Sequence, residues 1–146
     1  MADNGVRSLI AVLGAMILMF FLIELVEPPT VALLAAQRPA DMETYLAARN
    51  EPGVLPGRMA VYGVIGILAG YVVARIAGQY EMAHAGAAFL LQAFMMLRAF
   101  AADPAAVALP TGARVLLVAV TGAGMLLGAA VRGRAARFDS STEGES

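Results

Sequence analysis

The segment GVIGILAGYVVARIAG covers residues 63–78 of this chain. It belongs to an apolar block over residues 59–77, and Arg75 is the only charged side chain in the stretch. Small residues recur in it at every fourth position: Gly66, Gly70, Ala74 and Gly78. Glycine is a poor helix former in water, but small residues let two helices approach closely inside a bilayer. The stretch therefore predicts a membrane-spanning helix with a packing seam along one face.

Three other apolar blocks cover residues 8–26, 82–101 and 115–131. A helix over residues 8–26 rises about 28 Å at 1.5 Å per residue. That length is close to the ~30 Å hydrocarbon core of a bilayer. We therefore expect an all-α membrane protein with four transmembrane helices, packed as an antiparallel bundle in a single domain over residues 1–131.

The composition fits a membrane protein and argues against several other classes. Of the 146 residues, 60% are hydrophobic and 14% are charged, whereas about a quarter of the residues are charged in a typical soluble domain. The net charge of −1 argues against nucleic acid as a partner. Because the chain has no cysteine and one histidine, we expect no disulfide, no metal site and no cofactor.

The first connection, residues 27–58, is long. Two prolines at its start, residues 28–29, are expected to end the first helix. Further along, a helical spacing places three apolar side chains on one face, namely Met42, Tyr45 and Leu46. This pattern predicts a short amphipathic helix, which either lies on the membrane surface or closes over the bundle as a lid.

The other connections indicate the topology. Gly78 is expected to end the second helix in a tight turn, and Pro104 and Pro110 separate the third helix from the fourth. Residues 132–146 are first basic and then acidic, and predict a disordered tail. Four spans put both termini on one side of the membrane. The arginine-rich RGRAAR after the last span predicts that this side is cytoplasmic, which makes the first connection extracytoplasmic.

A second pair of glycines, Gly124 and Gly128, repeats the four-residue spacing in the last span. We expect the second and fourth spans to pack through these seams, either within one chain or across a dimer. Alternatively, the glycines line a path or let a helix hinge. The expected partners are the lipid bilayer and either a second copy of the chain or a larger membrane complex.

Glu24 and Arg98 are the ionisable residues near the outer ends of the first and third spans. Charged side chains within spans are costly and usually have a function or a partner. The sequence therefore predicts a Glu24–Arg98 ion pair or a coupling site. In the alternative, each side chain reaches the interface separately.

Glu81 and His84 lie on one helical face at the start of the third span, with Arg75 just across the turn. We expect these three residues at the membrane interface. A histidine within a span can ligate haem or a pigment, although bis-histidine ligation would need a second histidine. Near mid-membrane, Gln92 and Thr121 are expected to form a hydrogen bond between the third and fourth spans.

Two segments carry a resemblance to known proteins: PADMETYLAARNEPGVLPG, residues 39–57, and GVIGILAGYVVARIAGQYEMAHA, residues 63–85. With a first span that ends in an acidic residue, they resemble a group of small four-span bacterial membrane proteins. The similarity covers roughly Met16 to Arg132, and GYVVARIAG is its most specific part. The resemblance implies a bacterial inner-membrane location and carries no activity with it.

Three hypotheses for function follow. The sequence has neither a phosphate-binding glycine loop nor a histidine-centred nucleophile arrangement, so we expect a non-enzymatic accessory, scaffold or self-associating helix-packing module. The alternative is a small dimeric proton-coupled transporter that uses Glu24. The third is a haem- or pigment-associated subunit that uses His84.

Overall fold

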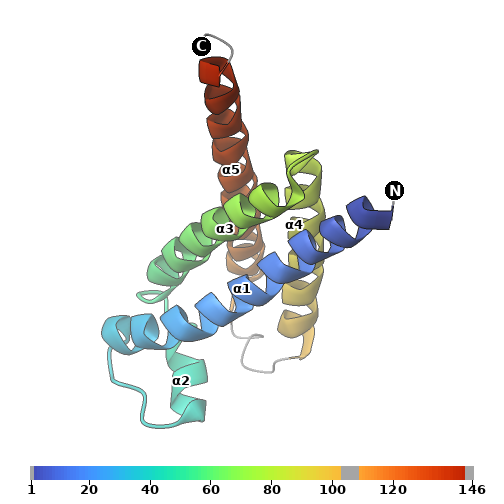
Figure 1. The fold of residues 1–146 in the computed structure, drawn as a ribbon. Helices are drawn as coiled ribbons and strands as arrows, with labels where there is room; N and C mark the ends of the chain where they lie inside the picture. Colours follow the sequence, from blue (N-terminus) through green and yellow to red (C-terminus); the bar gives the residue numbers. More distant parts are fainter. Residues whose placement is uncertain (1, 103–108, 144–146) are drawn as a thin grey trace.

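The computed structural model describes residues 2–102 and 109–143, and the regular structure of these residues is entirely α-helical. The helices are α1 (Ala2–Leu34), α2 (Met42–Ala48), α3 (Leu55–Ala77), α4 (Glu81–Ala102) and α5 (Thr111–Glu143). Figure 1 shows α1, α3, α4 and α5 packed together, with the short α2 at one end of the bundle below the end of α1.

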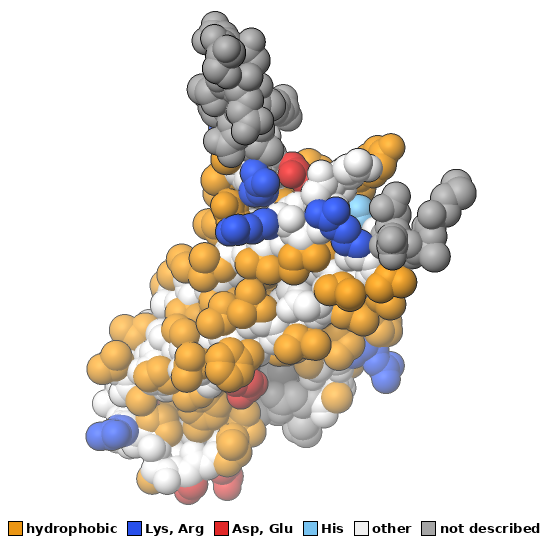
Figure 2. Space-filling model, in the orientation of Figure 1, with side chains coloured by type: hydrophobic (Ala, Val, Ile, Leu, Met, Phe, Trp, Pro, Cys, Tyr) orange, Lys and Arg blue, Asp and Glu red, His pale blue; other side chains and the backbone are white. Residues whose placement is uncertain are grey.

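Four of these helices are long and apolar enough to cross a membrane, which confirms the four expected spans. The qualifying segments are Gly5–Leu34, Leu55–Ala77, Glu81–Ala102 and Thr111–Ala135. Figure 2 shows one face of the molecule, on which hydrophobic side chains cover the middle and charged side chains gather toward the two ends. This distribution is the one that a multi-pass membrane protein requires.

The first helix differs from the prediction because α1 continues through Pro28 and Pro29 as far as Leu34. A proline removes one backbone hydrogen bond, but a membrane helix tolerates this loss where neighbouring elements hold it. Here Val31 is fully buried in a small cluster with Ala48 and Val54, which come from α2 and the start of α3. These contacts lie beyond the prolines and keep the last turns of α1 in place.

Two other helix ends can be compared with the sequence. Gly78 ends α3 with a φ of 69° and donates its N–H to the Ala74 carbonyl, so α4 starts after a tight turn, as expected. By contrast, α5 continues to Glu143, through most of the segment expected to be disordered. Alanine and arginine in that segment favour helix, and no proline interrupts it. Residues 103–108, with Pro104, lie outside the described part.

The glycine ladder of α3 lies directly against the backbone of α5. A Cβ placed on Gly66 would lie 2.6 Å from the carbonyl oxygen of Thr121. A Cβ on Gly70 would collide with the Met125 backbone, at 2.6 Å from its carbonyl carbon and 2.7 Å from its Cα. Only glycine permits so close an approach of two helices.

The α5 glycines make the reciprocal contacts. A Cβ on Gly124 would lie 2.5 Å from the Gly63 carbonyl oxygen, and one on Gly128 would lie 2.8 Å from the Tyr71 nitrogen. Residues later in α3 contact residues later in α5, so the two helices run in the same direction. The seam is therefore occupied within one chain. Ala74 is also fully buried, but Gly78 lies past the seam and serves the turn.

Candidate functional site

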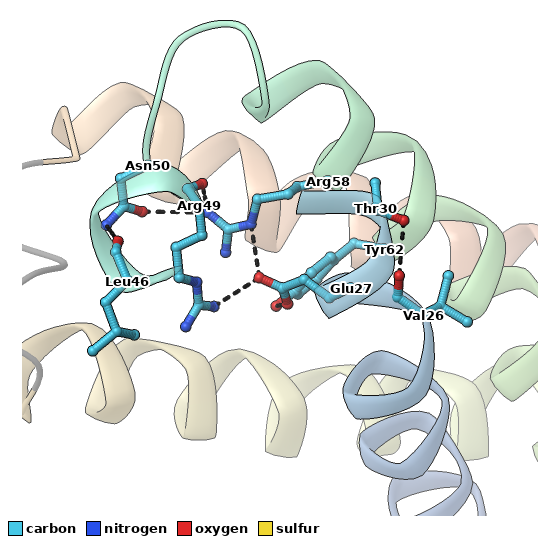
Figure 3. Close-up of polar contacts among 8 residues, drawn as sticks. All are labelled: Val26, Glu27, Thr30, Leu46, Arg49, Asn50, Arg58 and Tyr62. Atoms are coloured by element: carbon cyan, nitrogen blue, oxygen red, sulfur yellow. Dashed lines mark hydrogen bonds and ion pairs between the residues drawn. The ribbon is translucent and has the colours of Figure 1, made fainter. Parts of the chain in front are cut away.

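The most concentrated polar site in the described residues is centred on Glu27, near the α2 end of α1. Glu27 is 3% exposed. One carboxylate oxygen lies 2.9 Å from the Arg58 Nε and 3.0 Å from an Arg49 terminal nitrogen. The other oxygen accepts a 2.8 Å hydrogen bond from the Tyr62 hydroxyl. Figure 3 shows the carboxylate held between the two guanidinium groups, with the tyrosine behind it. We call these four residues the Glu27 centre.

The Glu27 centre joins three segments of the chain. Glu27 comes from α1, Arg58 and Tyr62 come from α3, and Arg49 is the C-cap of α2. The Arg58 guanidinium also donates to the Arg49 carbonyl oxygen at 2.9 Å and to the Asn50 side-chain oxygen at 3.3 Å. The end of α2 is therefore fixed to α1 by the Arg49–Glu27 ion pair and to α3 by charge-assisted hydrogen bonds from Arg58.

Burial makes the balance of charge in this centre important. The Arg58 residue is 1% exposed, so its charge has little access to water and needs the carboxylate. Two guanidinium groups share one carboxylate, which leaves the Glu27 centre with one excess positive charge. The more accessible of the two is Arg49, whose side chain is 24% exposed.

The start of α2 is also well defined. The Asp41 carboxylate accepts the Thr44 backbone N–H at 2.8 Å, and the Thr44 hydroxyl accepts the Asp41 N–H at 3.1 Å, which forms a capping box. The Thr44 hydroxyl also donates to the Asp41 carboxylate at 2.8 Å. The hydrogen bonds that this carboxylate accepts from the Thr44 backbone N–H and, next, from the Thr44 hydroxyl hold the pKa of Asp41 below its usual value. Burial, followed by the nearby Glu27 carboxylate, raises the pKa of Tyr45 on the same helix.

A cavity of about 460 Å³ lies beside the Glu27 centre, between α1, α2, α3 and α4. One part of its wall is charged or polar and includes Glu24, the Glu27 centre, Asn50 and Gln92. The other part is apolar and includes Phe20, Ile23, Met42, Met95, Met96 and Phe100. Volumes of about 300–1,000 Å³ with this mixture are typical of small-molecule sites.

The expected ion pair between Glu24 and Arg98 is not formed. Both residues are exposed, and the ion pairs among the described residues join Glu27 to Arg49 and Arg58 instead. Glu24 lines the cavity, one turn before Glu27 on α1, whereas Arg98 does not line it. Exposed charges near a helix end can reach water separately, so nothing forces them to pair.

The residues expected at the interface gather at the opposite end of the bundle. Arg75 is exposed and Glu81 is half-buried. The two ring nitrogens of His84 lie 2.8 Å from the Ser8 hydroxyl and 3.0 Å from the Tyr80 carbonyl oxygen. In this arrangement His84 connects α1 to the α3–α4 turn.

The expected hydrogen bond between Gln92 and Thr121 is absent. The Thr121 hydroxyl instead donates to the Leu117 carbonyl oxygen, one turn earlier in α5, at 2.8 Å. Gln92 is 1% exposed, and its side-chain oxygen has no hydrogen-bond partner. A threonine hydroxyl in a helix can donate to a backbone carbonyl oxygen of its own helix, one turn earlier. Thr121 does so, and Gln92 is therefore left without this donor.

Comparisons of the chain with protein-family models, with curated proteins and with solved structures gave no match.

Proposed function

We propose that this chain is a non-enzymatic accessory or scaffold module of the bacterial inner membrane, like the group of four-span proteins that its sequence resembles. The observation that carries the proposal is the Glu27 centre. Its carboxylate is paired with both arginines and accepts a hydrogen bond from Tyr62, which holds α2 to the ends of α1 and α3. A helix that is held in this way is suited to presenting a fixed surface.

The close packing of α3 against α5 supports the same role. Their backbones are in contact at Gly66, Gly70, Gly124 and Gly128, so the two helices cannot slide or separate without losing the whole interface. A rigid pair of this kind serves a module that positions a partner. Because this seam is already filled within the chain, we place the partner contact at α2 rather than at the ladder.

The proposed arrangement in the membrane is an antiparallel four-helix bundle with both termini in the cytoplasm. The common direction of α3 and α5 supports it, because alternate spans of such a bundle run the same way. Arginines after the last span, at positions 132, 134 and 137, favour the cytoplasm for the C-terminus. In this orientation α2 is an amphipathic helix on the outer surface.

Site-specific photo-crosslinking in native membranes tests the proposal. We expect a crosslinker at Ala47, which is exposed on α2, to capture one membrane protein in a stoichiometric complex. The same crosslinker at Leu9, which is 59% exposed at the other end of α1, serves as the matched control and should not capture it. Arg49→Gln, which releases α2, should abolish the capture. Equal capture at both positions, or none at either, contradicts the accessory role.

The proton-coupled transporter is the second candidate, because Glu24 is an exposed carboxylate that lines the cavity. A transporter of this kind should lose its transport on Glu24→Gln. A scaffold should keep the Ala47 crosslink in the same variant. The two measurements therefore separate the two functions.

A further inference from the structure

The cavity beside the Glu27 centre runs along α1 and α4. From α1 its lining begins at Phe20 and ends at Pro28, and from α4 it begins at Gln92 and ends at Phe100. In each helix the lining residues recur every three or four positions, which places them on one helical face. Eight residues of helix correspond to about 12 Å. The cavity is therefore an elongated space between two spans, and the scaffold role does not use it.

The cavity is partly open, and molecules dissolved in the bilayer have access to it. Phe20 and Met95 line it and are 40% and 43% exposed. Both residues belong to helices that are long and apolar enough to cross the membrane. Exposed apolar side chains on such helices contact the hydrocarbon of the bilayer. A ligand therefore reaches this cavity from the lipid and must itself be soluble there.

A buried acceptor without a partner lies at the deep end of the cavity. Gln92 is near the middle of α4 and is 1% exposed, and its side-chain oxygen has no hydrogen-bond partner among the described residues. Buried acceptors are almost always satisfied, and an unsatisfied one in apolar surroundings is costly. This oxygen therefore calls for a donor that is carried into the middle of the span.

The charges along the cavity favour a neutral ligand. The lining contains two carboxylates, Glu24 and Glu27, and two guanidinium groups, Arg49 and Arg58, so their formal charges cancel. The Glu27 carboxylate is already paired with both arginines. A charged group beside Gln92 would lose its hydration near the middle of a span, at a high cost in free energy. The donor that this oxygen requires is therefore an uncharged hydroxyl or N–H.

The apolar wall next to Gln92 suits an aromatic ring. Met95 and Met96 are the next lining residues of α4, and Phe20 lines the cavity from α1. Methionine sulfur makes favourable contacts with aromatic rings, and two rings pack well edge to face. A hydroxyl on an aromatic ring is uncharged at neutral pH, because its pKa is about 10. A phenol therefore combines a neutral donor with a ring that matches this wall.

We propose that this cavity binds a neutral, membrane-soluble phenol. The hydroxyl enters first and donates to the Gln92 oxygen, the ring lies against Met95 and Met96, and an apolar substituent extends away from Gln92 along the cavity. The probe is para-octylphenol. Its matched control is para-octylanisole, which has the same ring and chain but carries a methyl group in place of the hydroxyl hydrogen and so has no donor.

Photoaffinity labelling of the purified full-length chain in a non-ionic detergent tests the proposal. The reporter is a para-alkylphenol with a diazirine in its alkyl chain, and the two competitors are compared at matched mole fractions in the micelle. We expect the label on the lining segments of α1 and α4. The phenol should displace it at about tenfold lower mole fraction than the anisole, because one hydrogen bond separates the two. Equal displacement, which is the result if a water molecule satisfies Gln92, overturns the proposal, and so does labelling elsewhere.

Gln92→Leu assigns the hydrogen bond to its acceptor. In this variant the preference for para-octylphenol over para-octylanisole should disappear. The matched control Gln37→Leu changes an exposed glutamine outside the cavity lining and should keep the tenfold preference of the wild type. Gln92→Met, which is closer to glutamine in shape, answers the same question if Gln92→Leu does not fold. A preference for the phenol that persists without the Gln92 amide refutes the proposal.

The stability of the chain without ligand gives an independent check. Gln92→Leu should be at least as stable as the wild type in an unfolding titration, because it removes a buried polar atom that has no partner. If both Gln92→Leu and Gln92→Met are clearly less stable than the wild type, the oxygen has a partner in the free chain. That result would remove the need for a donor from a ligand and would overturn the proposal.

Discussion

Gly70→Ala tests whether the α3–α5 seam is as tight as its geometry indicates. The new Cβ would lie 2.6 Å from the Met125 carbonyl carbon and 2.7 Å from its Cα. Unstrained carbon atoms stay about 3.5–4.0 Å apart, so α5 must move away by about 1 Å. Overpacking of this kind costs about 1–3 kcal/mol, and the neighbour is backbone, which cannot rotate aside. The better helix propensity of alanine offsets up to about 1 kcal/mol of this cost.

The matched control is Gly86→Ala in α4, because a Cβ on Gly86 has no neighbour within 4 Å. There the same substitution should stabilise the chain by about 0.5–1 kcal/mol, through helix propensity alone. The gain in helix propensity is common to the two variants, so their free energies of unfolding should differ by the overpacking cost, about 1–3 kcal/mol, with Gly70→Ala the less stable. Unfolding in mixed micelles with increasing dodecyl sulfate measures both. If Gly70→Ala is as stable as Gly86→Ala, the helices do not meet at this glycine.

Two further predictions concern the Glu27 centre and α2. Glu27→Gln leaves the buried Arg58 guanidinium without its carboxylate and should lower the free energy of unfolding by about 3–5 kcal/mol. The control Glu43→Gln changes an exposed residue and should alter this free energy by less than about 0.5 kcal/mol. Equal effects of the two substitutions in the same unfolding titration would contradict the stabilising role of Glu27. The hydrogen bonds from Thr44 lower the pKa of Asp41, so its contribution to α2 is present in full above the unfolded value, near 3.8, and is lost as the pH falls through the lowered pKa. Hydrogen exchange at the Thr44 amide, corrected for the intrinsic pH dependence, should lose protection in that acid range, and protection that is independent of pH would disprove the capping role.

The spans could be predicted from the sequence because they depend on composition over about twenty residues. The same holds for the glycine spacing, since the close approach of two helices leaves a pattern within each of them. The ends of the helices depend on other contacts. The last turns of α1 persist past Pro28 and Pro29 because Val31 is buried against Ala48 and Val54, and none of these contacts is local in sequence.

The Glu27 centre could not be predicted from the sequence because its contacts, too, are not local in sequence. The sequence predicts residue 27 at the start of the first connection, directly after the apolar block over residues 8–26, where a carboxylate is ordinarily solvated. Its partner Arg49 follows α2, and its partners Arg58 and Tyr62 are on α3. Because the whole of α2 lies between these residues and α1, no spacing rule relates them to Glu27. The sequence drew attention to Glu24, which is three residues away on the same helix and lines the cavity without forming the ion pairs. A carboxylate at the end of a span and the arginines at positions 49 and 58 of the following connection were the available signal.

The proposed role of α2 requires that the Glu27 centre holds this helix against the bundle. Because the chain has no cysteine, spin labels can be attached to cysteines introduced at Ala47 on α2 and at Ala60 on α3, which are both exposed. Double electron–electron resonance in bicelles should give one narrow distance distribution in the otherwise wild-type chain and a broad one in Glu27→Gln. A distribution that is equally narrow in the Glu27→Gln variant, or broad in both proteins, would show that the Glu27 centre does not hold α2 in place.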